Sequence, residues 1–434
     1  MFKAIPIIYF LLLTALVCRA QDLPDNEKWN LHFQGTYISQ FKPSFSEKYH
    51  GQNSLKDSTE KVNSVTATMF FGFRLWKNAE FYFNPEVAGG DGLSGAYGMA
   101  ASTNGETFRI GDPSPFLYLA RGYLKQTFPL GKTAATHIDD GANQLNGQEP
   151  NQYLRFIVGK ISLGDIFDIN PYSNSPRTQF INWCLMNNGA WDYAANLRGY
   201  TVAFASILQL QKTSYRFAIA ELPIVANGLD LNSDLSKEFS LNAEVDRNYT
   251  WQHKDGHVRL LAYYNQGNMG TYSTATNEGV NIAATRAYGT YRMGIGISAD
   301  QQLSKNIGAF MRLGYSDGKT ETWCFTEADR TLSLGINING ALWHRKDDVI
   351  GIAQLVNGLS DVHKNYLAGG GLGFQLGDGQ LNYGNEMLSE IYYSWKPVNA
   401  GLWISGDYQF AINPGYNKDR GPVNVFSMRV HVEL

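Results

Sequence analysis

The feature that most constrains this chain is an alternation of apolar and polar side chains that recurs in sixteen segments. Side chains of a strand point alternately to opposite faces, so this period predicts strands with one apolar and one polar face. The last segment is the clearest: Phe426, Met428, Val430, Val432 and Leu434 share one parity, against Ser427, Arg429, His431 and Glu433. The sixteen predicted strands are 29–41, 62–76, 79–89, 116–129, 152–162, 198–211, 214–224, 238–250, 257–267, 287–303, 306–316, 329–340, 347–357, 385–396, 400–412 and 422–434.

The connections between these strands alternate between short and long. The short ones include 77–78, 212–213, 304–305 and 397–399, and the long ones are 42–61, 90–115, 163–197, 225–237, 268–286, 317–328 and 358–384. Membrane barrels have short periplasmic turns and long external loops, whereas a soluble sandwich has no reason to sort its loops. We therefore predict an all-β, transmembrane antiparallel β-barrel of about sixteen strands. Residues 130–151 depart from the rule, being long and polar where a short turn is expected.

The first twenty residues predict a secretory signal peptide. Lys3 precedes a nearly unbroken apolar run over 5–17, and Ala20 supplies a small residue at the cleavage position. The run is too short to span a bilayer as a helix. Cleavage would leave 21–434 as a single barrel domain in the outer membrane of a Gram-negative bacterium. A lipoprotein signal through Cys18 is an alternative, which the bulky Val17 before it disfavours.

Composition agrees with a barrel and excludes some partners. The chain has 25 Tyr, 24 Phe and 9 Trp, and barrels carry aromatic girdles at both membrane interfaces. The formal net charge is -3 with no basic block, so no nucleic-acid partner is expected. After cleavage only Cys184 and Cys324 remain, as one disulfide or as two buried free thiols.

Charged residues within the predicted strands fall on the inward parity. They include Arg74, Glu86, Arg121, Arg155 and Arg429. A charge facing lipid near the midplane would cost about 2–4 kcal/mol, which explains this placement. With both signs present, the lumen offers fixed donors and acceptors to a neutral, hydroxyl-rich solute. The alternative is a wall of salt bridges that only stiffens the barrel.

The longest loop, 163–197, concentrates the residue types that bind sugars. Aromatic faces stack on apolar sugar C–H faces, while amides and carboxylates bind hydroxyls. Apolar residues such as Phe167, Phe180 and Ile181 suggest that the loop folds into the barrel mouth and narrows it. A surface lid is the alternative. The loop's polar and aromatic residues are Asp165, Asp168, Asn170, Tyr172, Asn182, Trp183, Asn187, Asn188, Trp191, Asp192, Tyr193 and Asn196.

Several stretches match one family. They are FNPEVAGGDGLSG at 83–95, NGETFRIGD at 104–112, SPRTQFINWCLMNNGAWDY at 175–193, GYSDGKTETWCFTEADRTLSLG at 314–335, GGGLGFQLGDGQLNYG at 369–384 and DYQFAINPGYNKDRGPVNVF at 407–426. In these the chain resembles the carbohydrate-selective outer-membrane porins of the OprB type. The resemblance implies a sixteen-stranded barrel with inward loops that admits mono- and oligosaccharides by passive diffusion.

The resemblance also implies a constriction of arginines and carboxylates. Together with the inward parity, the candidates for sugar contact and constriction are Arg74, Glu86, Arg121, Arg155, Arg177, Trp183, Asn187, Trp191 and Asp192. Ser175 departs from the family, where an acidic residue is usual, and Leu434 replaces the usual terminal aromatic. The terminal strand is expected to bind the barrel-assembly machinery, with recognition weakened rather than lost.

Other functions remain as alternatives. An outer-membrane enzyme is a disfavoured alternative, although the sequence contains one Gly-x-Ser-x-Gly pattern, at 314–318, and one His-x-x-x-His spacing, at His253 and His257; no catalytic residue is assigned, and no cofactor or metal is expected. A secreted sugar-binding sandwich would share the alternation but stay soluble in water. A general diffusion porin for small polar solutes would share the barrel. The preferred sugar and the choice between monomer and trimer stay open.

Overall fold

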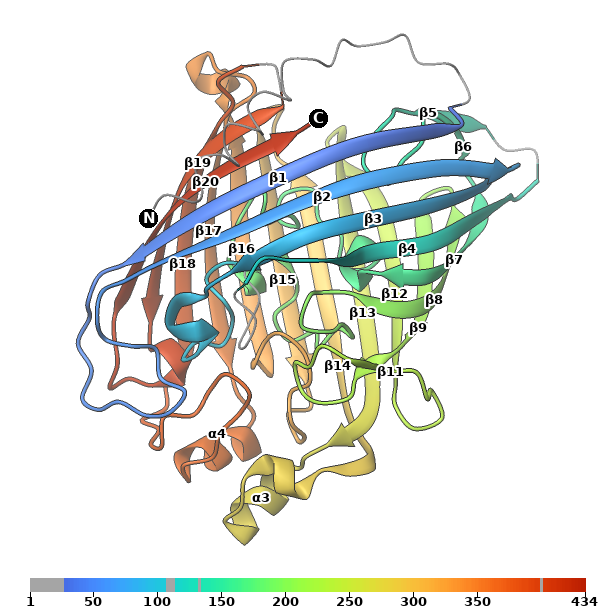
Figure 1. Cartoon of the computed structure of the whole chain (residues 1–434). Coiled ribbons are helices and arrows are strands. Elements are labelled where there is room, and N and C mark those ends of the chain that lie inside the picture. Colours follow the sequence, from blue (N-terminus) through green and yellow to red (C-terminus); the bar gives the residue numbers. More distant parts are fainter. Residues whose placement is uncertain (1–26, 107–113, 132–133, 399–400) are drawn as a thin grey trace.

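The computed structural model describes residues 27–106, 114–131, 134–398 and 401–434, and within them sixteen antiparallel strands close a barrel (Figure 1). The last strand pairs with the first, from Gln34 opposite Glu433 to Phe41 opposite Phe426, so the sheet has no free edge. The predicted signal peptide, 1–20, lies outside the described residues. Within the described part of the chain, no helix is both long and apolar enough to cross a bilayer.

All sixteen predicted strands are confirmed, with ends that move by at most four residues. The barrel strands are β1 (Trp29–Lys42), β2 (Glu60–Trp76), β3 (Ala79–Gly90), β4 (Phe116–Pro129), β7 (Tyr153–Ile161), β8 (Thr201–Leu210), β9 (Thr213–Ala220), β12 (Phe239–Trp251), β13 (Lys254–Met269), β14 (Ala287–Gln302), β15 (Ile307–Ser316), β16 (Arg330–Asn339), β17 (Val349–Gly358), β18 (Glu386–Trp395), β19 (Leu402–Ile412) and β20 (Val423–Glu433). We call the end with the two-residue connections the short-turn end.

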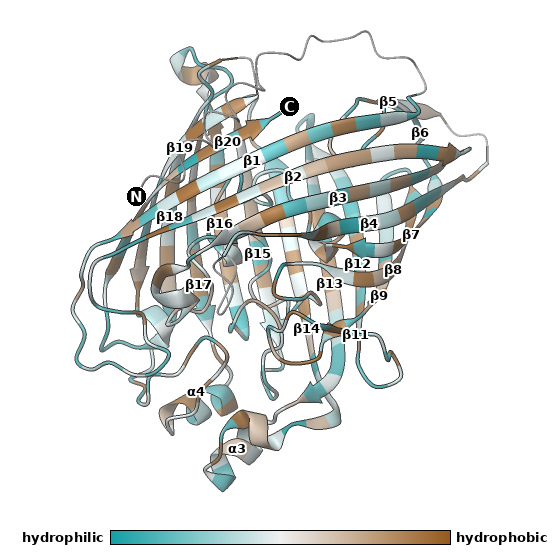
Figure 2. Cartoon of the chain, viewed as in Figure 1, coloured by the Kyte–Doolittle hydropathy of each residue, from teal (hydrophilic) through white to brown (hydrophobic). Residues whose placement is uncertain are grey.

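The two faces of the wall follow the predicted parity. Along β1, β2 and β3 apolar and polar residues alternate (Figure 2), and outward Met69 and Phe83 are 47% and 40% exposed. Inward charges such as Arg312 are fully buried inside the barrel. Strand β17, whose parity is ambiguous in the sequence, turns Ala353 and Leu355 inward, where they join an apolar cluster under the loops. An apolar inner face therefore explains the ambiguous pattern.

The departure at residues 130–151 is a hairpin folded into the lumen. Strands β5 (Ala135–Ile138) and β6 (Gly147–Pro150) form a separate two-stranded sheet at the short-turn end. In the turn between them, Asp140 Oδ1 accepts from Asn30 Nδ2 at 2.6 Å and contacts His32 Nε2 at 2.8 Å. Asn84 Nδ2 donates to Asn143 Oδ1 at 2.9 Å. Because Asn30, His32 and Asn84 lie on the inward parity, the hairpin enters the barrel.

Loop 163–197 also folds inward. It contains the short helix α2 (Trp183–Met186), and Phe167, Phe180, Ile181 and Leu185 are fully buried. The inward-packing prediction is thus confirmed over the surface lid. Cys184 of this loop and Cys324 are both buried, and within the described residues no disulfide joins them. The other elements are α3 (Tyr272–Glu278), α4 (Asp361–Ala368), β10 (Leu222–Pro223), β11 (Leu231–Asn232), and the 3-10 turns η1 (Leu93–Ala96), η2 (Leu163–Asp165), η3 (Ile282–Thr285), η4 (Gly340–Trp343) and η5 (Pro414–Tyr416).

Candidate functional site

A cavity of about 320 Å³ lies between the inward loop and the wall formed by β1 to β4. We call it the central cavity. Five of the nine predicted site residues line it: Glu86, Arg121, Arg177, Trp183 and Asn187. Glu86 and Arg121 come from β3 and β4, whereas the other three come from loop 163–197. The structure thus brings wall and loop residues that are distant in the sequence to one place.

Arg177 bridges two carboxylates across the cavity. Its Nε lies 2.9 Å from Glu106 Oε2, and its second terminal nitrogen lies 3.2 Å from Glu86 Oε2. Glu86, which is 2% exposed, also accepts from the hydroxyls of Tyr118 and Tyr200. These charge-assisted contacts hold the guanidinium and both carboxylates in fixed directions.

A second ion pair continues the lining. Arg121 donates to both oxygens of Asp165, at 2.6 and 2.8 Å, which is the bidentate geometry that fixes a guanidinium most firmly. The Arg121 guanidinium also lies 5.1 Å from the centre of the Tyr200 ring, and that of Arg198 lies 4.4 Å from the Tyr118 ring. The cavity therefore combines paired charges with aromatic rings that carry cations on their faces.

Tyr118 is a lining residue that the sequence did not reveal. In β4 the register slips at a β-bulge, where Asn84 pairs with Arg121 but Pro85 pairs with Leu119. The extra residue reverses the parity, so Tyr118 and Arg121 both face inward although strict alternation separates them. Glu106, Arg198 and Tyr200 were missed because they lie in or beside loops, where alternation gives no information. Glu106 does fall within the stretch 104–112 that resembles the family.

Trp183 and Asn187 contribute from α2 and its end. The Trp183 ring stacks on Phe325 with centroids 4.5 Å apart and planes inclined by 17°. Tyr193 stacks on the same Phe325 at 4.9 Å and also lines the cavity. Trp183 is 7% exposed and Asn187 is 4% exposed, so each presents a small part of its surface to a solute.

The other four predicted residues lie away from the central cavity. Arg74 and Arg155 line a small space at the short-turn end, where Arg155 pairs with Glu149 of the hairpin. Trp191 is 3% exposed, and its Nε1 donates to Asn242 at 2.9 Å. Asp192 is 2% exposed and accepts from backbone N–H groups of loop 317–329. These residues hold the hairpin and the loops in place.

Many inward wall charges bind the backbone of the inward loop. Arg312 donates to the carbonyls of Leu185 and Ser173 at 2.7 and 2.6 Å. Arg429 donates to the carbonyls of Pro176 and Gln179, both at 2.7 Å. Irregular backbone inside a barrel needs such partners, because buried peptide groups without hydrogen bonds are costly. These charges position Arg177 and Trp183 instead of lining the passage.

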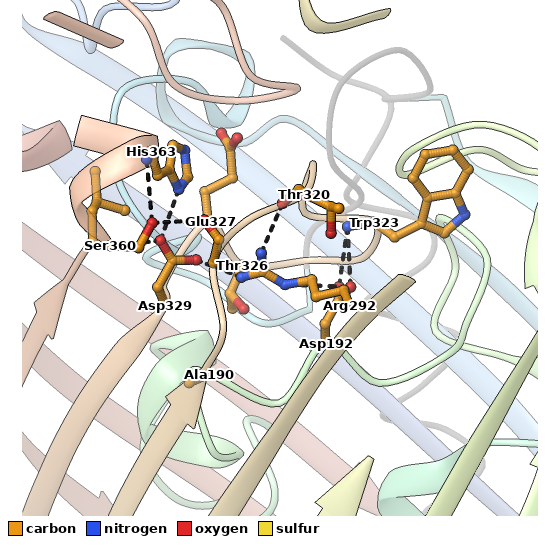
Figure 3. Close-up of polar contacts among 12 residues, drawn as sticks. Ala190, Asp192, Arg292, Thr320, Trp323, Thr326, Glu327, Asp329, Ser360 and His363 are labelled. Atoms are coloured by element: carbon orange, nitrogen blue, oxygen red, sulfur yellow. Dashed lines mark hydrogen bonds and ion pairs between the residues drawn. The ribbon is translucent and has the colours of Figure 1, made fainter. Parts of the chain in front are cut away.

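A second network joins three long loops at the end of the barrel opposite the short-turn end (Figure 3). Arg292 of β14 places Nη2 2.5 Å from Asp329 Oδ1 and Nε 3.9 Å from Asp192 Oδ2. Asp329 also contacts His363 Nδ1 at 3.0 Å and accepts from the Ser360 N–H at 2.8 Å. Burial disfavours the Asp329 carboxylate, but His363 and Arg292 outweigh this and lower its pKa below the ordinary value. The network thus contains a carboxylate that stays charged while buried.

This arrangement can hold and release hydroxylated solutes, because donors and acceptors of both signs are fixed around a cavity of about 320 Å³. Among the described residues, no cluster of three or more His, Cys, Asp or Glu side chains is arranged to hold a metal ion.

Comparison with known proteins gives one family and several similar folds. The sequence matches the family described as carbohydrate-selective porin, OprB family, over residues 70–434. The high-pH structure of Pseudomonas putida OprB is similar with a TM-score of 0.71 at 16% identity, covering 100% of this chain and 98% of that one.

Two further structures are more distant. The low-pH structure of Pseudomonas putida OprB has a TM-score of 0.51 at 12% identity, covering 100% of this chain and 98% of that one. The outer-membrane channel DcaP of Acinetobacter baumannii has a TM-score of 0.52 at 9% identity, covering 94% and 97%. At such identities the likeness concerns the fold alone. No curated protein matches the chain in sequence.

Proposed function

The chain belongs to the carbohydrate-selective porin family OprB, and from this premise we propose that mono- and oligosaccharides diffuse passively through its central cavity into the periplasm. Family and fold are those of an outer-membrane channel, not of an enzyme. The short-turn end then faces the periplasm, and the long loops face the exterior.

One observation carries the proposal: each carboxylate of the central cavity is paired with an arginine. Arg177 is shared by Glu86 and Glu106, and Arg121 is held by Asp165. Paired charges select weakly between cations and anions, whereas guanidinium N–H groups and carboxylate oxygens suit hydroxyls in fixed directions. The rings of Tyr118 and Tyr200 add apolar faces beside them.

We assign the constriction to Glu86, Arg121, Arg177, Trp183 and Asn187, joined by Glu106, Asp165, Tyr118 and Tyr200. The remaining candidates, Arg74, Arg155, Trp191 and Asp192, have a positioning role in this proposal. The C-terminal strand β20 is assigned to recognition by the barrel-assembly machinery, because its apolar parity continues to Leu434.

Liposome swelling tests the proposed function. Neutral sugars should enter liposomes containing the purified protein faster than amino acids of equal mass. A general diffusion porin would admit solutes according to mass alone, and that result would contradict the proposal. In planar bilayers, a panel of saccharides should reduce the single-channel current in a saturable manner. Chromatography of the same saccharides after incubation should show no cleavage, since released shorter sugars would indicate an enzyme.

A further inference from the structure

A second cavity of about 400 Å³ lies at the short-turn end, where residues of β14 to β19 and of the inward loop line it. It is separated from the central cavity by one stretch of the inward loop. Residues 174–177 of that stretch line the central cavity, whereas Tyr172 and Gln179 on either side of them line the second one. Its volume falls within the range of small-molecule sites, roughly 300–1,000 Å³. We call it the exit cavity.

The chemistry of the exit cavity differs from that of the central cavity. Of the described residues that line it, only Lys305 and Asp347 are charged, and both are exposed in turns at the rim. The remaining polar lining consists of amides and hydroxyls, including Asn306, Asn337 and Gln179. A site with many neutral donors and acceptors favours a neutral hydroxylated ligand over an ion.

Aromatic rings complete the lining. Trp403 lies on the inward parity of β19, together with the buried Ser405 and Asp407. Lys396 Nζ lies 4.9 Å from the centroid of its ring, and the centroid of the His431 ring lies 5.5 Å away. Tyr172 of the inward loop is a second ring. Such rings bind the apolar C–H faces of sugars.

The exit cavity is held in a fixed shape. Asn337 Nδ2 donates to the Tyr172 carbonyl at 2.9 Å and to the Tyr392 hydroxyl at 3.2 Å, which orients its amide. Within the described residues, the buried Asn337 Oδ1 has no hydrogen-bond partner, so the wall of the cavity contains an unpaired acceptor. Gly308 makes room for the Tyr172 ring, since a Cβ there would lie 2.0 Å from it.

We propose that the exit cavity is a second saccharide subsite, which binds a neutral sugar by ring stacking and amide hydrogen bonds at the periplasmic end of the barrel. This second subsite rests on the proposed function, because a sugar must first pass the central cavity. Two subsites on either side of residues 174–177 would let an oligosaccharide occupy both and move forward without returning to bulk water.

The first test is block of the single-channel current by a glucose trisaccharide added from the periplasmic side. Trp403→Ala should raise the half-blocking concentration about three- to tenfold, as expected for loss of one aromatic contact. The matched control is Trp395→Ala, because Trp395 is at the same end on the neighbouring strand but is 39% exposed on the outward face. Trp395→Ala should leave the half-blocking concentration unchanged.

The second test keeps every aromatic ring and needs no Trp403 variant. Ser304→Cys places a thiol in the lining of the exit cavity, while the native Cys184 and Cys324 are buried. The trisaccharide at ten times its half-blocking concentration should slow modification by a charged methanethiosulfonate about tenfold. Lys212→Cys, in an exposed turn at the same end, should be modified at an unchanged rate.

The outcomes separate the two proposals. If no saccharide blocks the unmodified protein, the proposed function itself fails. If saccharides block it while Trp403→Ala behaves like Trp395→Ala, or while Ser304→Cys is not protected, the second subsite is overturned and the proposed function stands.

Discussion

At the scale of single residues, Arg177 is the group on which the charge balance of the central cavity depends. Arg177→Gln keeps an amide donor but leaves Glu86 and Glu106 without their shared cation. We expect the half-blocking concentration for sugars to rise about tenfold, the effect of losing a hydrogen bond to a charged group. The reversal potential in a KCl gradient should shift toward cation selectivity.

Arg155→Gln is the control for Arg177→Gln. Arg155 also faces inward and pairs with a carboxylate, but it lies outside the central cavity. Equal effects of the two variants on sugar block would show that inward charge acts at a distance and would contradict a local constriction.

Glu327 gives the pH dependence of the loops at the end opposite the short-turn end. Burial is the main reason that its pKa is raised, to about 8, and the nearby Glu321 and Asp329 add to the effect. A carboxyl whose pKa is higher folded than unfolded stabilises the fold fully only while protonated, so stability falls as pH rises from about 4.5 to about 8. Glu327 accepts from the N–H groups of Gln375 and Leu376, at 3.0 and 2.7 Å. Proteolysis of loop 358–384 should therefore accelerate over this pH range, and Glu327→Gln should abolish the acceleration.

The sequence predicts residues of the wall better than residues of the loops. Parity alone places Glu86 and Arg121 in the lumen, whereas the bulge beside Pro85 hides Tyr118. Trp183 and Trp191 are equivalent in the sequence, because both stand among amides in one loop. Only tertiary structure separates them, by placing Trp183 at the cavity and joining Trp191 to Asn242 of the wall.

At the scale of elements, the hairpin β5–β6 reaches the central cavity from the short-turn end. Its turn residue Ala142 lines the central cavity, and Asp140 fixes the turn through Asn30 and His32. Asp140→Ala removes these contacts, each worth about 1–3 kcal/mol if a buried partner is left unpaired. We expect a larger and noisier single-channel conductance.

The neighbouring Asp139 supplies the control, because its side chain is 93% exposed and its ion pair with His137, at 3.5 Å, lies at the surface. Asp139→Ala should conduct like the unmodified protein. A complementary change replaces residues 130–152 by Asn-Gly, since Pro129 pairs directly with Tyr153 and a two-residue turn can join them. If conductance stays unchanged without the hairpin, the hairpin does not obstruct the passage.

At the scale of the whole molecule, the barrel and its contents were predictable to different degrees. The number of strands, the closure of the barrel and the sorting of its loops follow from a period of two, which can be recognised within each short strand segment of the sequence. The network inside depends on distant pairs, such as Asp192 with the Trp323 N–H, 131 residues apart. Nothing local encodes such pairs, so the sequence indicates an inward loop without indicating which wall residue binds it.

This difference between wall and interior predicts that the loops packed inside the barrel can unfold locally while the strands of the wall stay folded. Asp329→Asn weakens the pairing with Arg292 and His363 and leaves the buried Arg292 guanidinium with the more distant Asp192 as its charge partner, a change that costs at most about 3–5 kcal/mol. The wall is held by backbone ladders on every strand, which this substitution does not touch. We therefore expect faster proteolysis of loops 317–328 and 358–384, but an unchanged temperature at which the detergent-resistant barrel unfolds. Asp361→Asn should change neither property, because the Asp361 side chain is 84% exposed and its ion pair with Lys364 lies at the surface of α4. A matching fall in the unfolding temperature of Asp329→Asn would instead show that loops and wall unfold as one unit.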